Sequence, residues 1–112
     1  MQYLVTMKFL DPGPLMGPQQ ALGMMRGMTL PGLEVLVNLK SEGKIVAGGV
    51  PVGERALAVI VEAESTRELD SLLIDIPLWG AMETKVTPLQ DIEERLEFDR
   101  RFTERLEATL QQ

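Results

Sequence analysis

Residues 55–63 of the chain read Arg-Ala-Leu-Ala-Val-Ile-Val-Glu-Ala, and this stretch decides the fold. Its middle six residues, 56–61, are all apolar, so both faces of a strand built from them would be apolar. A half-buried strand alternates apolar and polar side chains, whereas a short run that is apolar throughout is typical of a strand covered on both faces. We therefore predict a central strand here and interpret the rest of the chain as its neighbours.

Three further strands are predicted on either side of it. Residues 2–9 alternate with a period of two, because Tyr3, Val5, Met7 and Phe9 share one face and Leu4, Thr6 and Lys8 share the other. Residues 45–52 give a strand weakened by glycine and proline, and residues 82–86 give a short last strand.

Helices are predicted between these strands. Residues 33–42 have apolar side chains at helical spacing and end at Gly43. Ser65 and Glu68 form a capping box that opens a helix ending before Pro77. Thr87 to Gln90 has the spacing of a second capping box and predicts a long C-terminal helix over residues 88–110.

Residues 10–32 interrupt this pattern with four Pro, five Gly and four Met. Pro18 suits the first position of a helix, but each internal glycine costs close to 1 kcal/mol relative to alanine. We predict a loop insertion with one loose helix over about residues 17–27.

The resulting order is strand, helix, strand, strand, helix, strand and an added helix, within a single domain of residues 1–112. This is the ferredoxin-like βαββαβ arrangement of the α+β class, an antiparallel sheet with both helices on one face. The apolar second face of the central strand then needs a cover. We expect two sheets to pair as a dimeric α+β barrel, with the final helix packed on the partner, as a homodimer or higher homo-oligomer.

Composition excludes several kinds of chemistry. The chain of 112 residues has no Cys and no His, which removes disulfides, thiol nucleophiles, imidazole bases and histidine-ligated metal or haem. Its net charge is 11 minus 17, or −6, which disfavours nucleic acid and anionic membrane surfaces as partners. We expect no cofactor and no metal. The first residues lack a basic leader and a long apolar run, so a cytoplasmic location is expected.

Two segments resemble a known family. One is residues 39–44 (Leu-Lys-Ser-Glu-Gly-Lys) followed by Gly48 and Gly49, and the other is residues 72–82, which contain the apolar turn Ile76-Pro77-Leu78-Trp79. The pattern resembles the dimeric α+β barrel superfamily and, within it, the muconolactone isomerase-like proteins. The resemblance implies the barrel fold and activities that range from isomerases to cofactor-free oxygenases. Fold alone does not choose among these activities.

Lys8, Glu83 and Lys85 are the candidate catalytic residues. The first and last strands are antiparallel neighbours in this topology, so Lys8 is expected to face Glu83 or Lys85. Glu83 would carry a proton and a lysine would stabilise an oxyanion or carboxylate. The alternative is a solvated cross-strand salt bridge.

The candidate ligand-binding residues are apolar or cationic. Trp79 and Tyr3 would wall an apolar cavity between sheet and helices, or else belong to the core or to an interface. Met24 and Met28 would form a pliable lid in which Arg26 holds an anionic group, or else this segment covers the sheet or meets another subunit.

Two functions follow. The first is a small-molecule enzyme, an isomerase or cofactor-independent oxygenase acting on a hydrophobic cyclic substrate. The second is a non-catalytic ligand-binding or assembly protein, in which side chains fill the same cavity. An enzyme requires a cavity of a few hundred Å³ beneath the methionine-rich segment.

Overall fold

The computed structural model describes residues 1–10 and 17–111. It contains a four-stranded antiparallel sheet in the order β2-β3-β1-β4. The strands are β1 (Gln2–Phe9), β2 (Ile45–Gly49), β3 (Ala56–Glu62) and β4 (Met82–Leu89). The predicted central strand is confirmed, because β3 pairs with β2 on one side and β1 on the other.

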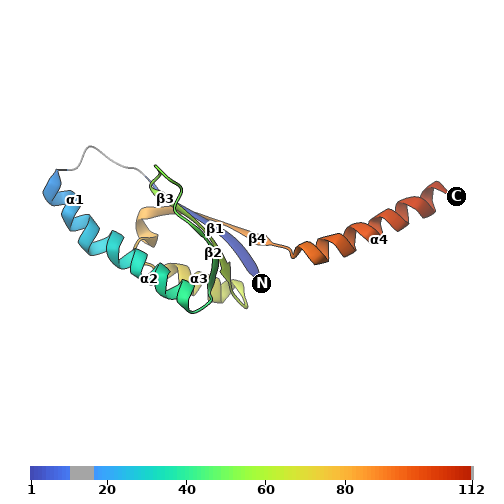
Figure 1. Ribbon diagram of the computed structural model, residues 1–112, viewed down its shortest axis with the longest axis horizontal. Coiled ribbons are helices and arrows are strands. Elements are labelled where there is room, and N and C mark those ends of the chain that lie inside the picture. The colour runs from blue at the N-terminus through green and yellow to red at the C-terminus, as the bar shows by residue number, and fades with distance from the viewer. Residues whose placement is uncertain (11–16, 112) are drawn as a thin grey trace.

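The helices α2 (Leu30–Ser41) and α3 (Thr66–Ile74) cover one face of this sheet (Figure 1). The capping box at the start of α3 is confirmed: the Glu68 amide donates to Ser65 Oγ at 3.1 Å. The Glu68 carboxylate in turn accepts from the amide of Glu64, at 2.8 Å. Ser65 therefore supplies a partner for one backbone donor that a helix start otherwise leaves free, and Glu68 holds the residue that precedes the cap.

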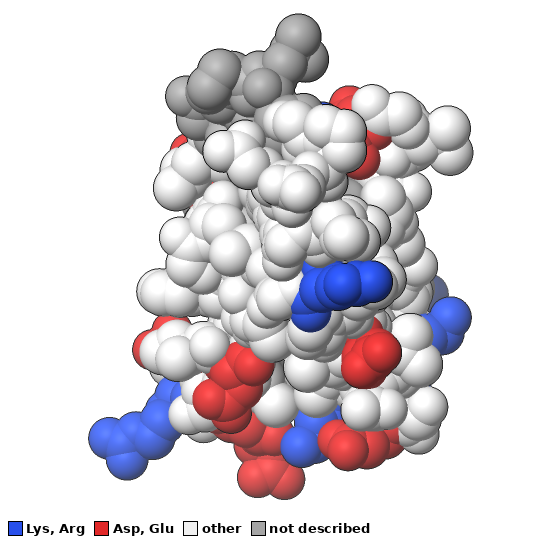
Figure 2. Space-filling model, turned by 90° about the vertical axis from the view of Figure 1, so that its left-hand side faces the viewer, with Lys and Arg blue, Asp and Glu red and all other residues white. Residues whose placement is uncertain are grey.

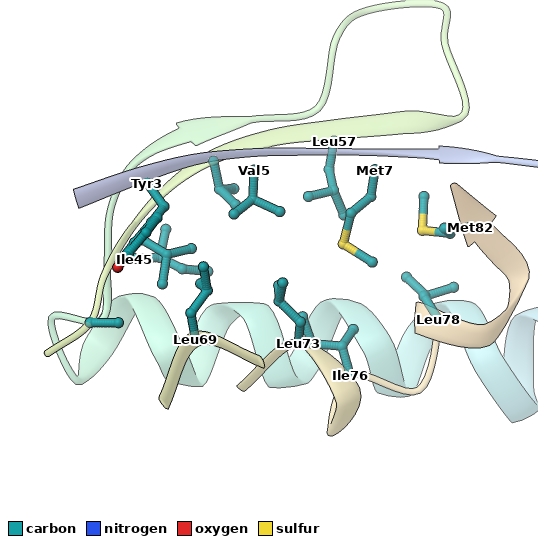
Figure 3. Packing of buried hydrophobic residues seen from close by; sticks show 13 residues of the cluster. Tyr3, Val5, Met7, Ile45, Leu57, Leu69, Leu73, Ile76, Leu78 and Met82 are labelled. Atoms are coloured by element: carbon teal, nitrogen blue, oxygen red, sulfur yellow. The ribbon is translucent and has the colours of Figure 1, made fainter. Parts of the chain in front are cut away.

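The core lies between the sheet and these helices. Alternate side chains of β1 and β3 point into it, and the inner side of α3 meets them (Figure 3). The members of the core are Tyr3, Val5, Met7, Ile45, Leu57, Val59, Val61, Ala63, Leu69, Leu73, Ile76, Leu78 and Met82. The opposite sheet face has no cover within the described chain, and its central positions Leu4, Ala58 and Ile60 are half-buried. We call it the open face.

The segment predicted as a loop insertion is mostly helical, so that part of the prediction is wrong. The described residues form α1 (Pro18–Met24), the π-helical turn η1 (Met25–Thr29) and then α2, one after another. Residues 11–16 of the expected loop lie outside the described residues. Pro31 follows η1 directly, at the junction with α2, and because proline has no amide hydrogen it donates no hydrogen bond to the preceding helical turn.

Gly32 explains why a glycine-rich helix packs here. A Cβ at Gly32 would lie 2.6 Å from Cγ of the buried Leu78, so only glycine admits this approach. Gly48 has φ of +119° just after the register shift of β2 between Ile45 and Ala47, and a Cβ there would clash with the Ala58 carbonyl oxygen. Both glycines are therefore requirements of the fold.

The second predicted capping box is wrong. Residues 87–89 continue β4, because Thr87, Pro88 and Leu89 pair with Leu4, Tyr3 and Gln2 of β1. β4 is an edge strand, where proline is tolerated. The last helix, α4 (Ile92–Leu110), begins after Asp91 instead.

α4 projects from the body and makes the molecule elongated, with extents of 73 × 30 × 23 Å (Figure 1). None of its residues is buried, although Leu96, Phe98, Phe102 and Leu106 are apolar. Two ion pairs run along the helix, between Glu97 and Arg101 at 3.5 Å and between Arg95 and Asp99 at 3.2 Å.

Candidate functional site

Lys8 of β1 and Glu83 of β4 are directly opposite each other in the sheet register. Lys85 follows two residues after Glu83, so it shares the same face and lies opposite Thr6. Opposite residues in an antiparallel pair have Cβ atoms about 5 Å apart, and diagonal neighbours lie within reach of long side chains. The expectation that Lys8 faces Glu83 is therefore confirmed, with Lys85 beside the pair.

These three residues lie on the open face. Their neighbours Tyr3, Val5 and Met7, at the alternate positions of β1, are the ones that enter the core. Lys8, Glu83 and Lys85 are exposed, and the half-buried Thr6, Ala58 and Ile60 lie beside them on the same face. The arrangement places one carboxylate and two ammonium groups on neighbouring strands at one end of the open face, and no ion pair of 4.0 Å or less is found between them in the part of the chain that the structure describes.

The candidate catalytic residues do not share a pocket with the candidate ligand-binding residues. Lys8, Glu83 and Lys85 lie on the open face, whereas Tyr3 and Met28 lie on the side of the sheet that the helices cover. The reason is the period of a strand: Lys8 cannot share a face with Met7 or Phe9.

Tyr3 is a core residue at the far end of the sheet. Its side chain is 2% exposed, and its hydroxyl donates to the Met1 sulfur at 3.5 Å. Tyr3 is opposite Pro88, whereas Lys8 is opposite Glu83, so the length of β1 separates Tyr3 from the charged group. The alternative interpretation of Tyr3, as part of the core, is the one that the structure supports.

Trp79 begins the short 3-10 helix η2 (Trp79–Ala81), which leads into β4. Its side chain is 40% exposed, so it does not plug the core. The preceding Leu78 fills that position against Gly32. Trp79 belongs to the same end of the sheet as Lys8, because Leu10 donates to the carbonyl of Ala81 at 3.3 Å.

The candidate ligand-binding residues of the methionine-rich segment lie in different surroundings. Met28 is partly buried and packs against the core, which matches the alternative that this segment covers the sheet. Met24 is half-buried and lines a cleft of about 230 Å³. Arg26 is exposed on η1 and is not among the residues lining that cleft.

That cleft contains a residue that sequence reasoning missed. It is formed by Phe9, Ala21, Met24, Met25, Thr29 and Arg55. Arg55 belongs to the turn before β3, and its carbonyl accepts a hydrogen bond of 3.2 Å from the Phe9 amide. Only the pairing of β1 with β3 brings this arginine to the methionines, so no local sequence pattern indicates it.

A second cleft, of about 340 Å³, lies between α2 and the β2 edge of the sheet. Leu33, Val37 and Val50 contribute apolar surface to it and Lys40 contributes a charge.

Two classes of site find no candidate among the described residues. Residues 1–10 and 17–111 contain no cluster of three or more acidic residues placed to hold a metal ion. Within the same ranges no helix has the length and apolar character needed to cross a membrane.

Comparisons with known proteins give one family and two similar folds. The family model of muconolactone delta-isomerase matches residues 1–94. The crystal structure of a muconolactone isomerase superposes with a TM-score of 0.66 at 23% identity, covering 81% of this chain and 90% of that one. A second similar structure is 5-chloro-2-hydroxyhydroquinone dehydrochlorinase from Burkholderia phenoliruptrix AC1100, in complex with 2,5-dihydroxybenzoquinone. Its TM-score is 0.62 at 24% identity, over 84% of this chain and 98% of that one. A search of curated proteins gave no significant match.

Proposed function

The chain belongs to the muconolactone delta-isomerase family, and from that premise we propose that it is a cofactor-independent enzyme that moves a proton on a small cyclic carbonyl compound. The two similar structures are an isomerase and a dehydrochlorinase by name. Removal of a proton from carbon beside a carbonyl is a step that suits both kinds of reaction. It requires a base and a stabiliser for the oxyanion that develops.

The opposition of Lys8 and Glu83, with Lys85 beside them, carries this proposal. Glu83 takes the proton from carbon, and the electron pair moves onto the carbonyl oxygen. The two ammonium groups stabilise that oxyanion. For an isomerisation, Glu83 returns the proton to the far end of the conjugated system, so that protons and charge balance.

The open face supplies the place for this chemistry. A second copy of the chain packed across it would cover Leu4, Ala58 and Ile60 and enclose the charged group beside them. Exclusion of water strengthens the attraction between ammonium groups and an oxyanion. The proposed site is thus completed by pairing of two sheets.

The proposal is tested by proton exchange in D₂O. Muconolactone and 2,5-dihydroxybenzoquinone, the compounds that the similar structures suggest, are incubated with the protein, and loss of their C–H signals is followed by NMR. We expect Glu83→Gln to slow exchange by roughly 10²-fold or more. Lys8→Met and Lys85→Met should each slow it by at least roughly tenfold. Glu34→Gln, an exposed carboxylate on α2, is the control.

Unchanged exchange in Glu83→Gln would overturn the assignment of the base. No exchange by the wild-type protein on either compound would count against the reaction class.

A second candidate function, an assembly protein without catalysis, is favoured by a separate observation. α4 presents apolar side chains to solvent along its whole length, with Phe98 and Phe102 about half exposed. Exposed apolar surface of this extent is typical of an interaction surface. The same exchange experiment separates the two functions, since assembly requires no proton transfer.

A further inference from the structure

Most of α4 lies beyond the part of the chain that the family model matches. The match ends at residue 94, whereas α4 continues to Leu110. The helix projects from the body and buries none of its residues (Figure 1). Packing of an apolar face supplies most of the stability of a helix in a protein, so this face needs a surface that covers it. What covers α4 is therefore a property of this chain and not one that the family match supplies.

The apolar side of α4 has the spacing of a helix that binds in a groove. Its side chains form one ridge, because they are four residues apart: Phe98, Phe102, Leu106 and Leu110. Each of them is at least 49% exposed. Glu94 lies four residues before Phe98 and places a carboxylate at the start of the same ridge. Anchors at this spacing are the ones that a hydrophobic groove accepts from a helix.

The cleft between α2 and the β2 edge is such a groove, with a volume of about 340 Å³, and we call it the α2–β2 groove. Leu57 and Val59 of β3, which belong to the core, form part of its lining. Gly48 of β2 is opposite Val59 and has no side chain to cover it, so the groove reaches down to the core. Val37 of α2 stands at the rim and is 63% exposed. The groove is therefore an apolar surface that is open to a partner.

α4 does not reach this groove in its own chain. It follows β4, and β4 and β2 are the two edges of the sheet, in the order β2-β3-β1-β4. Figure 1 shows α4 extending away from both α2 and β2. A ridge and a groove that are separated within one copy can meet between two copies, since each copy has one of each.

The charges of the two surfaces are opposite. Lys40, near the end of α2, contributes the charge of the groove, whereas α4 has six acidic side chains and four arginines. Within residues 1–10 and 17–111, neither Lys40 nor Glu94 belongs to an ion pair of 4.0 Å or less. If Glu94 pairs with Lys40 and α4 runs antiparallel to α2, Phe98 lies beside Val37, because each is about one helical turn further along.

The surface around α2 suits an apolar partner with few charges. Figure 2 views the molecule from the α1 end, where uncharged surface predominates in the upper part and charged side chains gather toward the bottom. α2 runs from α1 toward the bottom in Figure 1, so its C-terminal end approaches the charged part. This distribution matches a ridge that is apolar along its length and carries its carboxylate at one end.

We propose that the α2–β2 groove is the docking site for α4 of a second copy of the chain, with α4 antiparallel to α2 and Glu94 beside Lys40. Each copy gives one helix and receives one, so the contact is head to tail. The groove and the open face are different surfaces, so the contact forms whether or not the open faces pair. The proposal rests on assembly through α4, the second candidate function above, and does not require proton transfer.

Cysteine cross-linking tests this contact cleanly, because the chain has no Cys of its own. Copies with Val37→Cys and copies with Phe98→Cys carry tags of different size, and they are mixed and oxidised. We expect a disulfide between the two kinds of copy and roughly tenfold less product when either variant is oxidised alone, since a disulfide requires Cα atoms about 4.4–6.8 Å apart. Arg100→Cys is the matched control, because two residues after Phe98 is the opposite side of the helix. It should not cross-link to Val37→Cys.

An exchange of charges gives a second measurement on the full chain. Lys40 and Glu94 are both exposed, so their substitution should leave the fold intact. Lys40→Glu and Glu94→Lys should each raise the protein concentration at which larger assemblies appear in light scattering, by roughly threefold or more. The double variant restores opposite charges and should recover the wild-type concentration dependence.

Three results would overturn the proposal: no product between Val37→Cys and Phe98→Cys, equal product with Arg100→Cys, or cross-linking of Phe98→Cys to itself as efficiently as to Val37→Cys. The last result would mean that α4 pairs with another α4. Loss of assembly in Phe102→Glu without the Val37 cross-link would retain assembly through α4 and remove the groove as its partner. Proton exchange is measured separately, so failure here is distinguishable from failure of the proposed enzyme.

Discussion

Lys8 and Glu83 are directly opposite each other across β1 and β4, on the sheet face that the helices leave open. A cross-strand pair of this kind is either a solvated salt bridge or a proton carrier with its electrostatic partner. The two roles respond differently to an exchange of the residues.

The double variant Lys8→Glu with Glu83→Lys separates these roles. Each single change places like charges opposite one another and should lower the free energy of unfolding by about 0.5 kcal/mol, since exposed cross-strand pairs are weak. The double variant restores the pair and should recover stability, as measured by urea denaturation. Proton exchange should stay lost, because the carboxylate has moved to β1. Recovery of both stability and exchange would mean that the position of the carboxylate does not matter.

Gly32→Ala should destabilise the protein, because its Cβ would lie 2.6 Å from Leu78 Cγ in the core. Overpacking of this kind costs about 1–3 kcal/mol. Gly27→Ala, where no atom lies within 4 Å of the added Cβ, is the matched control. It should be neutral or stabilising by about 0.5–1 kcal/mol, since alanine suits helical backbone better than glycine. Thermal unfolding of both variants tests the tight approach of α2 to Leu78, and equal effects would contradict it.

The Met1 amino group and Glu62 predict a pH dependence. They lie 2.9 Å apart, and this hydrogen bond raises the pKa of the amino group and lowers the pKa of Glu62. The amino group therefore contributes stability below its ordinary pKa of 8.0, and this contribution is lost as pH rises through the raised value. Glu62 contributes above its ordinary pKa of 4.5, and its contribution is lost as pH falls through the lowered value.

Glu62→Gln should accordingly differ from the wild-type protein most between about pH 4.5 and 8, and the difference should shrink outside that range. Urea denaturation at several pH values measures it. A difference that is constant with pH would show that the pair does not contribute through its charges.

Phe102→Glu tests whether α4 contributes to contacts between copies of the chain and not to the stability of a single copy. Phe102 is 49% exposed and α4 buries none of its residues, so unfolding of the body should change by less than about 0.5 kcal/mol. If the apolar side of α4 mediates assembly, the same variant should lower the mass of the assembly seen by light scattering. Arg100→Glu changes charge on the same helix and serves as the control. A large loss of stability in Phe102→Glu would show that α4 packs on its own body.

Much of the fold was predictable because residues 56–61 and the Ser65–Glu68 capping box act locally. The extent of β4 was not, since Thr87 and Pro88 resemble a helix start and only pairing with β1 holds them extended. The helical segment 18–41 was obscured by its glycines and prolines, whose low helix propensity is overridden by packing of Met28 on the core and of Gly32 on Leu78.

The candidate site residues also fall into those that the sequence could predict and those that it could not. The opposition of Lys8 and Glu83 follows from strand order, and alternation along β1 places Lys8 on the face opposite Met7. Their separation from the core residues Tyr3 and Met7 follows from the same alternation. Arg55 was not predictable, because its place in the cleft depends on the contact between a turn and a helical segment far apart in sequence.

The central claim is that a second copy of the chain covers the open face, and the mass in solution tests it most directly. Light scattering should return at least twice the chain mass of 12.4 kDa for the wild-type protein. Ile60→Glu, at the middle of the open face, should shift the mass toward one chain, whereas Val52→Glu, at a fully exposed position in the turn after β2, should not. A wild-type mass of 12.4 kDa at every concentration would contradict the account.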